Sequence, residues 1–148
     1  MNHIYHFNEG ILSLPVGYDD ETSIALVWPQ SEAFLSPFSL TIEKESINNN
    51  DLVNYVEEQI NALKDELDDF REIDRNETTI DNQKAIEVKF TWCSDDDEKI
   101  VQRQAFVIHN GTALIFNGTM MGKFVNEGDK KWKNILNSFI FRRDNNDA

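Results

Sequence analysis

The segment from Asp51 to Leu67 restricts the possible folds of this chain more than any other feature. At about 100° per residue, its apolar side chains form one continuous arc around a helix. These side chains are Leu52, Val53, Val56, Ile60, Leu63 and Leu67. Tyr55, Gln59 and Ala62 widen the arc to about half of the circumference, whereas a helix on one core usually shows little more than about 100°. The pattern therefore predicts an amphipathic helix that contacts its own core and a second apolar surface.

Alternating apolar and polar residues predict strands before and after this helix. The predicted strands cover residues 4–7, 11–14, 23–28, 38–43, 86–92, 100–109 and 112–117. Both faces of strand 23–28 are apolar, which favours cover on both sides of the sheet. Asn110 and Gly111 form a strong hairpin signal between the last two strands.

The chain closes with a loop over 118–128 and a second predicted helix capped by Asp129. The apolar face of this helix consists of Trp132, Ile135, Leu136 and Phe139. The order of elements predicts an α+β fold, in which a twisted antiparallel β-sheet packs with two main α-helices. The length indicates a single domain over 1–148, with a polar tail from about residue 142.

The charge balance of 14 basic and 27 acidic residues, a net charge of -13, argues against anionic partners. So acidic a chain repels nucleic acid and anionic lipid headgroups. The first residues do not form a signal peptide, and no stretch reaches the roughly 18 consecutive apolar residues of a membrane span. The single cysteine, Cys93, fits a reducing compartment. We therefore expect a cytoplasmic protein that does not insert into a membrane.

The ionisable residues do not form a pattern that supports catalysis or metal binding. His3, His6 and His109 lack the spacing of a metal site and are expected at the surface. The acidic run 95–98 lacks the alternating ligands and the glycine of a calcium loop, and is expected to be a solvated hairpin tip. Cys93 is followed by aspartates that would raise the pKa of its thiol. We expect neither an enzyme nor a bound cofactor or metal.

Two glutamines lie at unusual places in these patterns. Gln59 borders the apolar arc of the helix, and Gln104 shares a strand face with Ile100 and Phe106 if alternation holds. An amide both donates and accepts hydrogen bonds, and a buried polar group without a partner is costly. Two interpretations stay open: each amide bonds to a neighbouring loop, or the pair serves as polar anchors for a guest in an apolar groove.

Several segments, taken in order, resemble the Eag-type chaperones of type VI secretion systems. They are Ser23-Ile24-Ala25-Leu26, Phe38 to Lys44, Tyr55-Val56-x-x-Gln59-Ile60, Leu67-x-x-Phe70 and Arg103-Gln104-x-Phe106. These chaperones belong to the DcrB-like group, which is related in fold to the Mog1 and PsbP proteins. The resemblance extends to about Phe141 and implies a Mog1/PsbP-like fold.

The resemblance also implies a function and a binding site. Chaperones of this type are homodimers that bind the hydrophobic N-terminal transmembrane segments of secreted effectors of the PAAR or Rhs type. They shield those helices in the cytoplasm and promote loading of the effector onto the secretion spike. By matching position, the residues implied to line the groove are Ile24, Leu26, Gln59, Leu63, Leu67, Ile100 and Gln104.

A second hypothesis keeps the fold and changes the partner. On a Mog1-like scaffold the chain would be a non-enzymatic regulator or adaptor that binds a folded protein through an acidic surface. In that case the acidic run 95–98 would matter more for binding than Leu67. Fold alone does not decide between the two.

Overall fold

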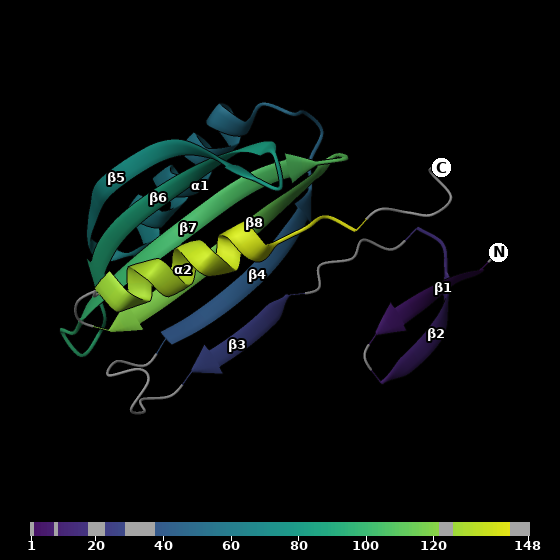
Figure 1. Ribbon diagram of the computed structural model, residues 1–148, viewed down its shortest axis with the longest axis horizontal. Helices are drawn as coiled ribbons and strands as arrows, with labels where there is room; N and C mark the ends of the chain where they lie inside the picture. The colour runs from purple at the N-terminus through teal and green to yellow at the C-terminus, as the bar shows by residue number, and fades with distance from the viewer. Residues whose placement is uncertain (1, 8, 18–22, 29–37, 122–125, 143–148) are drawn as a thin grey trace.

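The computed structural model describes residues 2–7, 9–17, 23–28, 38–121 and 126–142 (Figure 1). Its elements are β1 (Asn2–Phe7), β2 (Gly10–Pro15), β3 (Ile24–Trp28), β4 (Phe38–Ser46), α1 (Leu52–Glu66), β5 (Asp68–Ile80), β6 (Gln83–Cys93), β7 (Lys99–His109), β8 (Thr112–Met121) and α2 (Asn126–Ser138). Within those ranges, neither helix has the length and apolar character needed to cross a bilayer.

Strands β3 to β8 form one antiparallel six-stranded sheet in the order β3-β4-β8-β7-β6-β5. Asn110 and Gly111, with φ of 51° and 73°, make the predicted tight turn between β7 and β8. Helix α1 packs against β5, β6 and β7 on one face of the sheet, and α2 covers the opposite face (Figure 1). The predicted α+β fold is therefore confirmed, and it is consistent with a Mog1/PsbP-like architecture.

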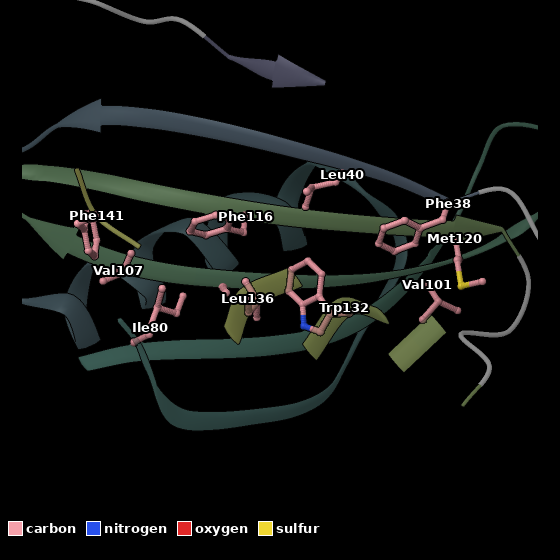
Figure 2. Close-up of a cluster of buried hydrophobic side chains, with 12 residues drawn as sticks. Phe38, Leu40, Ile80, Val101, Val107, Phe116, Met120, Trp132, Leu136 and Phe141 are labelled. Carbon is pink, nitrogen blue, oxygen red and sulfur yellow. The ribbon is translucent and has the colours of Figure 1, made fainter. Parts of the chain in front are cut away.

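The core on the α2 side is built around Trp132 (Figure 2). Its main members are Phe38, Leu40, Ile80, Val101, Val107, Phe116, Met120, Trp132, Leu136 and Phe141. The buried indole of Trp132 donates a hydrogen bond of 2.7 Å to Glu87 on β6. A Cβ added at Gly118 would lie 2.8 Å from Cε3 of Trp132, so the close approach of α2 to β8 requires glycine there.

The core on the α1 side confirms the predicted amphipathic helix. The side chain of Asp51 caps α1 by accepting a hydrogen bond of 3.0 Å from the backbone N–H of Asn54. Three helix residues, Tyr55, Val56 and Ile60, are buried against the sheet. Their partners from β6, β7 and β8 are Ile86, Val88, Phe90, Phe106, Ala113 and Ile115. The rest of the apolar arc is half-buried or exposed.

The end of the chain differs from the sequence-based expectation. β8 continues to Met121, through residues predicted to form a loop, because its second half pairs with both β4 and β7. Helix α2 begins at Asn126, so Asp129 lies inside the helix and does not cap it. The carboxylate of Asp129 instead accepts a hydrogen bond of 3.0 Å from Arg103, which also binds Glu87 at 3.0 Å. This half-buried ion network ties α2 to β6 and β7.

The start of the chain leaves apolar surface open. β1 and β2 pair with each other in a separate two-stranded sheet, set apart from the main sheet in Figure 1. β3 is an edge strand of the main sheet, and Ile24 and Leu26 on it are 50% and 45% exposed. The expectation that strand 23–28 has cover on both faces is therefore not met within one chain.

Candidate functional site

Gln59, Leu63 and Leu67 lie along one edge of α1. They follow one another at intervals of four residues, and each is half-buried. Leu63 and Leu67 pack against the border of the core beneath the helix. One turn before Gln59, the hydroxyl of Tyr55 donates a hydrogen bond of 2.7 Å to Glu45 on β4. Tyr55 therefore links the first half of α1 to β4, whereas the helix as a whole packs against β5, β6 and β7.

Ile100 and Gln104 lie on β7, on the same face of the sheet as α1. The ring of Phe106 meets Tyr55 edge-on, with centroids 6.3 Å apart. The pairing of β7 with both neighbours is regular, so every second residue before Phe106 shares its face. Gln104 is half-buried and Ile100 is 9% exposed.

Gln104 contains an unpaired polar atom. Its side-chain oxygen Oε1 is buried and has no hydrogen-bond partner, and it stands alone in this respect among the side chains that the structure describes. Buried acceptors are ordinarily paired, and an unpaired one costs about 1–3 kcal/mol. The residue as a whole is half-buried.

Gln102, two residues before Gln104 on the same face, is a residue that the sequence analysis did not single out. Its Nε2 donates to Asn117 at 2.9 Å and to Thr119 at 3.3 Å, and its Oε1 accepts from the indole of Trp92. The spacing of two from Gln104 and Ile100 was the signal that could have found it. The amide nitrogen and oxygen of Gln102 both have hydrogen-bond partners, whereas the amide oxygen of Gln104 has none. The two amides therefore have different roles.

Polar residues continue this face across β8 and β4, beyond the strands that α1 packs against. The register aligns Gln104 with Asn117 and Thr41, and it aligns Gln102 with Thr119 and Ser39. The β8 and β4 members of both rows are half-buried. We call this surface, together with Gln59, Leu63, Leu67 and Ile100, the α1-side binding face. It combines an apolar helix edge with a floor of small hydroxyl and amide groups.

Comparison with known proteins assigns the family. A model of the DcrB family matches residues 9–138. The chain belongs to the DcrB family. Among solved structures, the chain is similar to PA94 of Pseudomonas aeruginosa, a protein of unknown function suggested to be a regulator. The two structures match with a TM-score of 0.80 and 19% sequence identity, over 97% of this chain and 99% of PA94. At that identity the likeness shows the fold alone.

A second solved structure is more distant. LpqN of Mycobacterium tuberculosis, involved in cell envelope biogenesis, matches with a TM-score of 0.48 and 10% identity over 82% of this chain and 84% of that one. A search among curated proteins finds no significant match.

The other two predicted site residues of this DcrB-family chain, Ile24 and Leu26, lie on the opposite face. They pair directly with Ile42 and Leu40 on β4, and Leu40 belongs to the core under α2. Directly paired residues share a face of the sheet. Five of the seven predicted residues therefore lie on the α1 side of the sheet. Within one chain, Ile24 and Leu26 lie on the α2 side instead.

Two of the ionisable side chains considered earlier, Cys93 and His109, are held in structural contacts. Burial raises the pKa of the Cys93 thiol, and the carboxylate of Asp69, 3.6 Å away, raises it further. His109 is not free at the surface as expected: its ring stacks on Phe141 at 4.0 Å and lies 3.0 Å from the amide oxygen of Gln83. Across the described ranges, no group of three or more potential metal ligands stands together.

Proposed function

We propose that this DcrB-family protein is a chaperone, without catalytic activity, that shields the N-terminal transmembrane helices of a type VI secretion effector. In this proposal it holds the helices in the cytoplasm and promotes loading of the effector onto the secretion spike. The family assignment and the α1-side binding face support the proposal.

The observation that carries the proposal is the unpaired Oε1 of Gln104, which lies on the same face of the sheet as a half-buried apolar helix edge. A transmembrane helix satisfies its own backbone but often carries hydroxyl or amide side chains at packing surfaces. A protein amide with a spare acceptor can bond such a donor, while Leu63 and Leu67 contact the apolar surface around it. A polar anchor in an apolar surface suits helices of varied sequence.

The energetics favour many modest contacts. A transmembrane helix presents on the order of 1,000 Å² of apolar surface, worth roughly 25 kcal/mol at about 25 cal/mol per Å². A chaperone must cover much of this area and later release it. The net charge of -13 would keep the loaded complex soluble and tolerate basic residues beside the guest helices.

Co-expression with a guest tests the proposal. The guest is the hydrophobic N-terminal segment of a candidate spike-associated effector, fused to a soluble carrier. We expect the fusion to be soluble and to co-purify only with the chaperone, and Leu67→Glu to abolish co-purification. Asn61→Glu, at an exposed position of the same helix outside the apolar arc, is the matched control and should retain the guest. Equal solubility of the fusion without the chaperone would refute the proposal.

A second candidate is a regulator or adaptor of a folded partner. It is favoured by the exposed acidic tip at 95–98 and by the description of PA94 as a suggested regulator. Reversal of Asp95 and Asp96 to lysine separates the two: it should leave guest co-purification unchanged if the chaperone proposal holds. If this reversal abolishes partner binding and Leu67→Glu leaves partner binding unchanged, the regulator hypothesis is favoured.

A further inference from the structure

Strand β5 forms one edge of the main sheet, and its two halves differ (Figure 1). Both register shifts in its pairing with β6 fall before or at Asp74. Residues 74–80, which we call the regular half of β5, pair with β6 without interruption. Beyond Arg75 this half contains one charged residue, Glu77. Bulges and charges are the usual means by which an edge strand avoids pairing with another chain, so the regular half is the less protected one.

The hairpin turn fixes which backbone groups of the regular half face outward. Ile80 pairs with Gln83 across the two-residue turn at 81–82, whose φ angles are 46° and 64°. In such a hairpin the residues that flank the turn bond to each other, and hydrogen-bonded pairs alternate along the strands from there. Glu77 and Thr79 therefore direct their backbone N–H and C=O groups away from β6, toward the open edge.

A groove lies beside the regular half, between the start of α1 and the ends of β5, β6 and β7. Its volume is about 980 Å³, which is at the upper end of the range for ligand pockets. Its apolar lining residues are Leu52, Val53, Ala85, Ile86 and Ile108. Glu77 and Thr79 also line the groove, and Glu77 pairs directly with Ile86 of the core under α1. The side chains of Glu77 and Thr79 therefore lie on the α1 face of the sheet.

The charges around the groove favour a basic occupant. Asp51 and Glu77 contribute two carboxylates to the lining, and Lys84 near the turn contributes one cation. The cation of the regular half, Arg75, is already bonded to Glu57 at 2.7 Å. The chain as a whole has a net charge of -13. A basic side chain that approaches Glu77 therefore meets a negative potential.

We propose that the regular half of β5 binds an extended segment of a partner protein as an added strand, with side chains anchored in the groove. Strand addition supplies hydrogen bonds between the two backbones, and a pocket beside the edge selects side chains. The segment carries a basic side chain opposite Glu77 and a large apolar side chain opposite Thr79, two residues away on the same face. Thr79 is small, so this apolar side chain reaches over it toward Val53, which is 62% exposed. The proposal does not depend on the guest helices.

A synthetic peptide and the full chain test the proposal. The probe peptide is Ser-Leu-Thr-Lys-Thr-Leu-Ser, with fluorescein at one end and an amide at the other, and its leucines lie two residues from the lysine in both directions. The control peptide, Ser-Thr-Leu-Lys-Leu-Thr-Ser, has the same composition, but its leucines and lysine lie on opposite faces of a strand. In fluorescence anisotropy the probe should bind saturably with a Kd below about 1 mM, and the control should bind about tenfold more weakly or worse.

Proline at position 79 tests the backbone pairing. Thr79→Pro removes an N–H that faces the open edge, where proline is tolerated, so the variant should fold. It should raise the Kd of the probe about tenfold or more, because the added strand loses a hydrogen bond and meets the proline ring. Thr79→Val keeps the N–H and a similar shape, and it is the matched control that should bind like the unaltered protein. Far-UV circular dichroism and the Tm of each variant confirm folding.

Reversal of Glu77 tests the side-chain selection. Glu77→Lys should raise the Kd of the probe about fivefold, and a probe with glutamate in place of lysine should bind this variant better than the unaltered protein. Leu67→Glu, on the α1-side binding face, should leave the Kd of the probe unchanged, because the groove beside β5 does not include Leu67.

Each result decides the proposal. Saturable binding that fails to appear up to about 1 mM would overturn it. Equal affinity for the two peptides would indicate general attraction to an acidic surface, and a Kd unaffected by Thr79→Pro would exclude strand addition. Loss of probe binding in Leu67→Glu would place the peptide on the α1-side binding face and would also overturn the proposal.

Discussion

Replacement of Gln104 by leucine should make the free protein more stable and the guest complex weaker. Leucine removes a buried acceptor that has no partner, which costs about 1–3 kcal/mol, and it has a similar size. We expect the free energy of unfolding to rise by about 1–2 kcal/mol. For a domain of this length that corresponds to an increase in Tm of about 2–8 °C. Thermal unfolding followed by circular dichroism measures it.

The effect on guest binding should have the opposite sign. If Oε1 of Gln104 accepts a hydrogen bond from the guest, leucine leaves the guest donor unpaired at a cost of about 1–3 kcal/mol. That corresponds to a Kd for the guest segment that is about 5- to 150-fold higher, since about 1.4 kcal/mol is a factor of ten. Fluorescence anisotropy of a labelled guest segment held in mild detergent would measure this Kd.

Gln102→Leu is the matched control on the same face of the same strand. Its amide bonds to Trp92, Asn117 and Thr119, so leucine there should destabilise the free protein by about 2–4 kcal/mol. If Gln104→Leu also destabilises by more than about 1 kcal/mol, its acceptor is satisfied in the free protein and the reasoning fails. If it stabilises without changing the Kd, the unpaired oxygen has no role in guest binding.

Three further changes test the fold and its electrostatics. Burial and the Glu45 carboxylate raise the pKa of Tyr55 above its ordinary 10.0, so the contribution of Tyr55 to the free energy of unfolding is complete below pH 10 and falls as the pH rises further. Tyr55→Phe should therefore lose less stability than the unaltered protein between about pH 8 and 11, as measured by urea unfolding. Gly118→Ala should lower the free energy of unfolding by about 1–3 kcal/mol, because the new methyl group would clash with the ring of Trp132. A free energy of unfolding that changes by less than about 0.5 kcal/mol would contradict this. Asp51→Ala should cost about 1 kcal/mol through loss of the cap of α1, whereas Asp51→Asn should cost much less.

Local patterns determined most of the secondary structure. The apolar arc of the segment from Asp51 to Leu67 predicted α1 closely, since helical periodicity depends only on residues near one another in sequence. The Asn110-Gly111 turn was equally readable, because few other residues accept positive φ at both positions. Patterning failed at the end of β8, where hydrogen bonds to two distant strands extend the ladder to Met121. It also failed at Asp129, whose partner, Arg103, is 26 residues away.

The sequence by itself determined that Gln59 borders an apolar helix edge and that Gln104 sits on a strand face with Ile100 and Phe106, because helical and strand periods are local properties. Only the tertiary structure decided which faces meet. Strand order and pairing set Ile24 and Leu26 on the α2 side, and they leave the Gln104 oxygen without a partner while Gln102 has three. The physical reason is that pairing across the sheet depends on the cooperative fit of segments far apart in the chain, which no single segment encodes.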